Sequence, residues 1–127
     1  VPSALVISGQ PLQTERPDNC PLYVSADIRE SHPATPLIFL QTEVRESGNF
    51  DLKKRAFEAD KREAARKGME KILETDKNIW FINPGMKLGD DHEATVDGVH
   101  PTDLGFERML KKVQPQIIRI LQKHGIK

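Results

Sequence analysis

Asp97 and His100 are the residues of this sequence whose types and spacing are best suited to chemistry. They lie three positions apart in the run Asp97-Gly98-Val99-His100-Pro101, just before an expected helix. If this segment makes a single turn, the carboxylate can accept the Nδ1 proton of the imidazole, which leaves Nε2 free to act as a general base. Spacing alone, however, favours a turn without chemistry, because Asp-x-x-His is a short and common pattern.

The elements that must position this pair alternate between strands and helices. Short apolar runs predict buried strands at residues 4–8, 36–42 and 78–83. Amphipathic segments predict helices at residues 21–31, 51–75 and 103–123. This order is typical of right-handed βαβ units and predicts an α/β fold, with a parallel sheet covered by helices on both faces. A length of 127 residues fits one domain with a single core.

The two longer helices are expected to bury apolar stripes against the sheet. In the segment 51–75, which Asp51 can cap, the stripe consists of Phe57, Ala64, Ala65, Met69, Ile72 and Leu73. In the last helix the inward side chains are expected to be Phe106, Met109, Leu110, Val113, Ile117, Ile120 and Leu121.

Composition excludes several function classes. The 19 basic and 19 acidic residues balance, so nothing predicts bulk attraction to nucleic acid or to an anionic membrane. No apolar stretch is long enough to span a bilayer. The single cysteine, Cys20, excludes an internal disulfide framework and leaves the compartment open. Because the chain opens at Val1 almost directly into an expected strand, we expect its numbering to begin inside a larger protein.

The residues around the Asp-His pair carry a family resemblance. Residues 87–109 resemble the last conserved block of SGNH (GDSL-like) hydrolases, in particular the subgroup that reads D-G-x-H-P-T-D-L-G-F, which here runs from Asp97 to Phe106. Weaker similarity extends back through residues 78–84 and 36–42. The resemblance implies a flavodoxin-like three-layer α/β/α sandwich that hydrolyses esters or transfers acyl groups without a cofactor. It also implies that Asp97 is the orienting acid and His100 the base of a serine triad.

The sequence departs from the family pattern in the residues that should complete the site. It contains no Gly-Asp-Ser motif and no identifiable glycine block of the oxyanion hole, both of which would lie before Val1. We therefore expect residues 1–127 to be the carboxyl-terminal part of one SGNH-like domain that lacks its first strand and its nucleophile. The family's oxyanion asparagine should follow a strand like 4–8, and the available substitutes are Gln10 and Asn19.

Internal nucleophiles and other functions remain open at this point. Ser8 and Ser47 stand beside glycines at expected strand ends, where serines are usually turn residues. One alternative function is a catalytically inactive SGNH-like binding domain. Another is a metal-binding or interaction module on the acidic loop 90–100, although no ligand spacing there matches a known motif. His92 in this loop occupies a position where the subgroup leads us to expect glycine. For the hydrolase, the expected partner is a small-molecule or carbohydrate ester.

Overall fold

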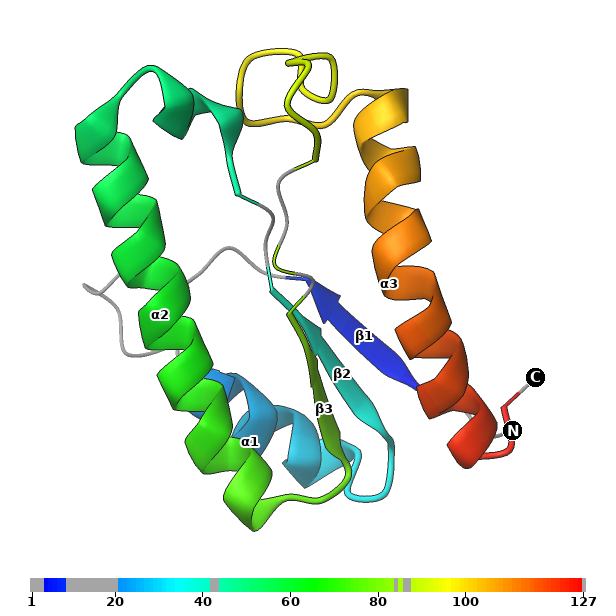
Figure 1. The fold of residues 1–127 in the computed structure, drawn as a ribbon. Helices are drawn as coiled ribbons and strands as arrows, with labels where there is room; N and C mark the ends of the chain where they lie inside the picture. The colour runs from blue at the N-terminus through cyan, green and yellow to red at the C-terminus, as the bar shows by residue number, and fades with distance from the viewer. Residues whose placement is uncertain (1–3, 9–20, 42–43, 84, 86–87, 127) are drawn as a thin grey trace.

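The computed structural model describes residues 4–8, 21–41, 44–83, 85 and 88–126. Within these residues, three strands and three α-helices alternate, and a short 3-10 helix precedes the second α-helix (Figure 1). In chain order these are β1 (Leu5–Ser8), α1 (Pro21–Ser31), β2 (Leu37–Leu40), η2 (Glu46–Asn49), α2 (Leu52–Thr75), β3 (Ile79–Ile82) and α3 (Asp103–Lys123). Every strand and α-helix expected from the sequence is present, and the 3-10 helix was not expected.

The sheet is parallel, with the strand order β1-β2-β3. The central strand β2 pairs with both neighbours, so that Leu37 lies opposite Leu5 on one side and Ile79 on the other. Leu37 and Ile38 are fully buried. The almost continuous apolar character of this strand therefore reflects burial on both faces, as expected for a parallel sheet.

Alternate side chains of the sheet pack into two separate cores. Leu37 and Phe39 contact Met69 and Ile72 of α2, and Ile28 of α1 packs against the same cluster. On the opposite face, Ile38 and Ile82 contact the α3 residues Val113 and Ile120. Helices α1 and α2 thus cover one face and α3 covers the other (Figure 1). The predicted α/β fold with helices on both faces of a parallel sheet is confirmed.

The predicted apolar stripes are only partly buried. Phe57 at the amino end of α2 is exposed, and so are Phe106 and Leu110 at the amino end of α3, at 50% and 54%. Helical periodicity predicts which side chains share a face, but not how far the partner layer extends. A four-residue strand spans about 13 Å. A helix of 21 or 24 residues spans more than about 30 Å, and the amino ends of α2 and α3 lie beyond the sheet (Figure 1).

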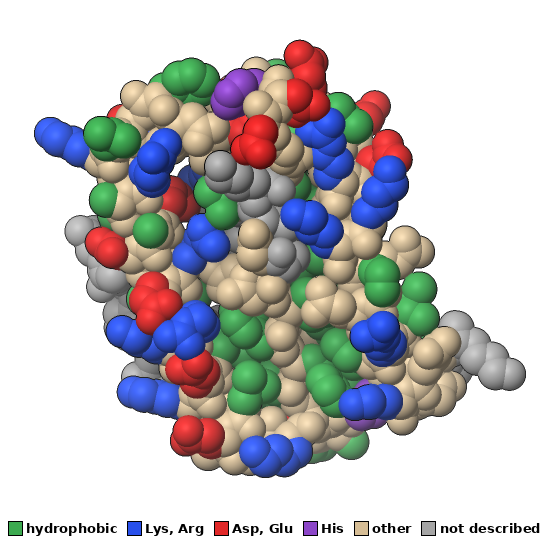
Figure 2. All heavy atoms as spheres, viewed as in Figure 1, with side chains coloured by type: hydrophobic (Ala, Val, Ile, Leu, Met, Phe, Trp, Pro, Cys, Tyr) green, Lys and Arg blue, Asp and Glu red, His purple; other side chains and the backbone are tan. Residues whose placement is uncertain are grey.

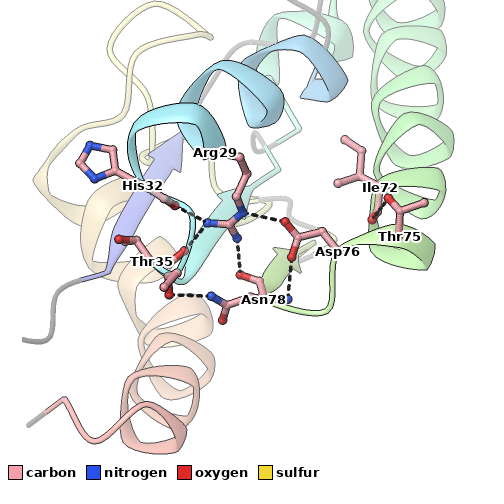
Figure 3. Close-up of polar contacts among 8 residues, drawn as sticks. Arg29, His32, Thr35, Ile72, Thr75, Asp76 and Asn78 are labelled. Carbon is pink, nitrogen blue, oxygen red and sulfur yellow. Dashed lines mark hydrogen bonds and ion pairs between the residues drawn. The ribbon is translucent and has the colours of Figure 1, made fainter.

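A polar cluster ties the chain together at the edge of the sheet where β2 and β3 begin (Figure 3). The Arg29 guanidinium donates to Asp76 Oδ2 at 2.7 Å, to the carbonyl of His32 at 3.0 Å and to that of Asn78 at 3.1 Å. Burial is the largest single influence on Asp76 and raises its pKa, but the hydrogen bonds from Arg29 and from the N–H of Asn78, together with the positive charge of Arg29, hold this pKa below its usual value. The cluster fixes the end of the sheet opposite the loop that carries Asp97 and His100.

Charges of both signs are interleaved on the face of the molecule that Figure 2 shows. Acidic and basic side chains alternate along α2 in Figure 2, where Arg66 pairs with Glu63 at 2.7 Å and also contacts Glu70. No helix in the described part of the chain combines the length and apolar character needed to cross a membrane.

Candidate active site

The structure brings Asp97 and His100 into direct contact. The Nδ1 atom of His100 lies 2.6 Å from Oδ2 of Asp97, on the loop that precedes α3. The side chains are 76% exposed for His100 and 51% exposed for Asp97. Among the described residues, Asp97 is the hydrogen-bond partner of the ring, so the second ring nitrogen is left available to a reacting group.

The turn between the two residues is built by the same carboxylate that contacts the ring. Oδ1 of Asp97 accepts hydrogen bonds from the backbone N–H groups of Val99 at 2.9 Å and His100 at 2.8 Å, while Oδ2 faces the imidazole. Short side chains such as aspartate commonly close turns in this way. The backbone N–H of His100, then its ring, then the N–H of Val99 lower the pKa of Asp97 to about 2. The carboxylate is therefore ionised, and its Oδ2 accepts a hydrogen bond from the protonated Nδ1 of His100.

A closed loop holds this turn against the start of α3. The N–H of Val96 donates to the carbonyl of His100 at 2.8 Å, and the N–H of Thr102 donates to the carbonyl of Ala94 at 2.9 Å. Thr102 then caps α3, because its hydroxyl oxygen accepts the N–H of Gly105 at 3.2 Å. The imidazole is thus carried by a loop that runs directly into a rigid helix.

Two glycines allow the close approaches of this loop. Gly98 has a φ of +80°, and a Cβ there would lie 3.0 Å from the backbone nitrogen of Ser47. A Cβ at Gly105 would lie 2.1 Å from the carbonyl oxygen of Ala94. Larger residues at either position would push the loop away from η2 or from α3.

An ion pair that was not predicted from the sequence holds the acidic part of the loop against α3. Arg108 of α3 donates to both carboxylate oxygens of Asp91, at 2.6 and 2.7 Å, and to the carbonyl of Leu88 at 2.9 Å. The hydrogen bonds from Arg108 hold the pKa of Asp91 well below its usual range. Asp91 therefore anchors the loop to α3. The interval of 17 residues between the partners carries no local pattern that could have revealed the pair.

The metal-binding alternative gains no support from this arrangement. Within the part of the chain that the structure describes, no three His, Cys, Asp or Glu side chains come close enough together to hold a metal ion. Asp91 is directed to Arg108 and Asp97 to His100, while His92 packs its ring on Phe50 at a centroid distance of 5.7 Å.

The other candidates from the sequence are not joined to the pair. Ser47 lies beside the loop, but through its backbone: its N–H donates to the carbonyl of Gly98 at 2.9 Å. No hydrogen bond links its hydroxyl to His100 among the described residues. Ser8 ends β1, and its side chain is outside the described part of the structure. Gln10 and Asn19, the oxyanion candidates, also lie outside the described residues.

His92 adopts the backbone conformation that explains why glycine was expected there. Its φ of +60° lies in the left-handed region, which L-amino acids adopt at an energetic cost and achiral glycine adopts freely. Both His92→Gly and His92→Ala remove the ring contact with Phe50, but only alanine keeps a Cβ in this conformation. We expect the glycine variant to be more stable than the alanine variant by about 1 kcal/mol in urea unfolding. Equal or reversed stabilities would contradict this explanation.

The lowered pKa of Asp97 predicts a pH dependence of stability. Its folded value of about 2 lies below the reference value of 3.8, so the ionised carboxylate stabilises the fold above pH 3.8, and this contribution is lost as the pH falls toward 2. The free energy of unfolding of the wild type should therefore exceed that of Asp97→Asn at neutral pH, and the difference should shrink below pH 3.8. Urea unfolding curves recorded on both sides of this pH test it, and a difference that does not depend on pH would contradict it.

Comparison with known proteins places the chain in a family. A model of the GDSL-like lipase/acylhydrolase family matches residues 7–118. The crystal structure of a protein described as a GDSL-like lipase from Bacteroides ovatus ATCC 8483 matches at 45% sequence identity with a TM-score of 0.74. That match covers 80% of this chain and 30% of the other, so this chain spans less than a third of that protein's length. No curated protein matches the chain. The chain belongs to the GDSL-like lipase/acylhydrolase family, a family of hydrolytic enzymes, and has an α/β fold with a parallel sheet.

Proposed function

We propose that the parent protein, the gene product that contains this chain, hydrolyses esters with Asp97 as the orienting acid and His100 as the general base. Residues 1–127 would then be the carboxyl-terminal part of a single SGNH-like domain, and a serine outside them would be the nucleophile. The observation that carries the proposal is the 2.6 Å contact between Asp97 Oδ2 and His100 Nδ1, made by a side chain that is largely open to solvent.

The proposed reaction uses His100 twice. Its Nε2 accepts the serine hydroxyl proton while the serine oxygen attacks the ester carbonyl, and it then donates that proton to the alcohol oxygen as the tetrahedral intermediate collapses. The acyl-enzyme is cleaved in the same way by water, which releases the carboxylic acid and restores the serine. Throughout, Asp97 holds Nδ1 protonated and stabilises the positive charge of the imidazolium. This sequence of steps needs no cofactor.

Within this proposal the substrate is an O-acetylated carbohydrate or another small acyl ester. p-Nitrophenyl acetate presents the same acetyl group with a better leaving group, which makes it a suitable assay substrate. We expect the parent protein to hydrolyse it, and the isolated residues 1–127 to show no turnover above background, with circular dichroism as the control for folding.

Two outcomes would overturn this assignment. Turnover by the isolated chain that disappears in both His100→Ala and Ser8→Ala would mean that the nucleophile is Ser8. A folded parent protein that cleaves neither p-nitrophenyl acetate nor acetylated sugars would favour the inactive binding domain, which the lack of a Gly-Asp-Ser motif within residues 1–127 also suggests.

A further inference from the structure

We propose that Glu46 and Thr95 are positioning residues that fix the tip of the Asp97–His100 turn. This inference rests on the proposed function for its effect on turnover. Glu46 was not singled out in the sequence, and Thr95 lies in the segment 87–109 that carries the family resemblance but outside its D-G-x-H-P-T-D-L-G-F block.

Glu46 is an ionisable residue in an unusual place. It lies in η2 and is 6% exposed, although glutamate is almost never buried without a partner. Its Oε2 accepts the hydroxyl proton of Thr95, which is 49 positions later in the chain, while Oε1 is buried and finds no partner among the described residues. The positive charge of Arg108 on α3 also acts on Glu46, and the hydrogen bond to Thr95 is what connects this buried side chain to the loop of the candidate site.

The Thr95 hydroxyl connects Glu46 to the backbone beside Asp97 through a second hydrogen bond. Its hydroxyl has a single proton, and because that proton points to Glu46, a lone pair is free to accept the N–H of Gly98 at 3.1 Å. The carbonyl of Gly98 in turn accepts the N–H of Ser47 at 2.9 Å. Because Ser47 follows Glu46 directly, these hydrogen bonds form a closed ring between η2 and the loop.

The hydrogen-bonded ring restrains the backbone that follows Asp97. The N–H of Gly98 belongs to the peptide bond between Asp97 and Gly98, so the bond from Thr95 sets the orientation of that peptide. The turn is also closed by Asp97 itself, through its bonds to Val99 and His100, and by the backbone bond from the N–H of Val96 to the carbonyl of His100. The hydrogen-bonded ring therefore keeps the Asp97 side chain aligned with the imidazole of His100, although the loop is exposed. Small displacements of a catalytic group lower the rate strongly.

If the hydrogen-bonded ring only stabilised the fold, the variants would show a different pattern of effects from that of a positioning role. In that case Thr95→Val would lower the melting temperature and leave the geometry of the Asp97–His100 pair unchanged in the molecules that remain folded. A positioning role predicts that the folded variant turns over more slowly, with substrate binding largely intact. It also predicts that the strongly hydrogen-bonded Nδ1 proton of His100 becomes weaker or disappears in proton NMR spectra.

The test uses four single variants of the parent protein, one double variant and one control. Thr95→Val is nearly isosteric and removes the hydroxyl, whereas Thr95→Ser keeps it. Glu46→Ala removes the acceptor, whereas Glu46→Gln keeps a side-chain oxygen that can accept from Thr95. Glu63→Gln, on the exposed face of α2, is the matched control for loss of a glutamate charge.

On p-nitrophenyl acetate we expect Thr95→Val and Glu46→Ala each to lower kcat by about 10- to 100-fold, with KM nearly unchanged. Thr95→Ser and Glu46→Gln should restore most of the rate, and Glu63→Gln should match the wild type. The double variant Glu46→Ala/Thr95→Val should lose no more than the worse single variant, because both break the same ring.

Three results would overturn the proposal. The first is an unchanged kcat and an unchanged Nδ1 signal in folded Thr95→Val. The second is equal losses in Thr95→Val and Thr95→Ser, and the third is multiplicative losses in the double variant. If Glu46→Ala does not fold, the valine and serine pair at position 95 still decides the question. The NMR signal also remains informative if the parent protein cleaves no ester, so failure of the proposed function and failure of the ring can be told apart.

Discussion

Replacing His100 by glutamine in the parent protein is expected to lower kcat for p-nitrophenyl acetate by at least about 10⁴-fold. Glutamine is close in size and can still donate a hydrogen bond to Asp97, so the loop should keep its shape. It cannot accept a proton at neutral pH, so the serine would attack without a general base and the alcohol would leave unprotonated. Because the imidazole acts mainly in the transition state, KM should change little.

The matched control for this variant is His92→Gln. His92 lies in the same loop, but its ring packs on Phe50 and is not directed to Asp97. The same substitution there should leave kcat within a few fold of the wild type. Steady-state kinetics on both variants, with circular dichroism to confirm the fold, separates loss of the base from disturbance of the loop. Comparable losses at the two positions would contradict the assignment of His100.

Asp97→Asn is expected to have the second large effect, a fall in kcat of about 10⁴-fold, as the equivalent change has in serine proteases. The geometry fixes how the asparagine would lie. The two backbone N–H groups of Val99 and His100 need an oxygen acceptor, so the amide oxygen should take the place of Oδ1. The amide NH₂ group then faces the Nδ1 atom of His100. It can only donate there, which forces the ring proton onto Nε2 and removes the base.

This prediction has a direct spectroscopic check. Nitrogen chemical shifts of the His100 ring should report a proton on Nδ1 in the wild type and on Nε2 in Asp97→Asn, while the circular dichroism spectrum stays the same. A variant that loses activity with an unchanged tautomer would show that Asp97 acts only on the structure of the turn. A variant that keeps its activity would show that Asp97 is not the orienting acid.

The order of elements and a turn between Asp97 and His100 could both be predicted from the local sequence, but the spacing alone favoured a turn without chemistry, and the role of the pair was implied only by the family resemblance. The order of elements and the turn each leave a pattern that can be recognised within a few residues of sequence. The runs that form β2 and β3 are apolar because both faces of the sheet are covered, and the Asp97 turn closes over three positions. Signals of this kind are present in local composition and spacing.

Features that depend on distant partners could not be predicted in this way. Periodicity placed Phe106 and Leu110 on the inner face of α3, but the short strands leave no sheet beneath them. The pair of Arg108 with Asp91 and the contact of Glu46 with Thr95 join residues 17 and 49 positions apart. No pattern in the sequence around one residue of either pair predicts its partner.

In the proposed mechanism Asp97 and His100 activate a serine nucleophile. The most direct test is a crystal structure of the parent protein after reaction with a fluorophosphonate, which forms a stable adduct with an activated serine. We expect phosphorus on a serine outside residues 1–127, with that serine's oxygen within about 3 Å of His100 Nε2. Asp97 should still contact Nδ1. An adduct on Ser8 or Ser47, or on any serine beyond reach of His100, would contradict this mechanism.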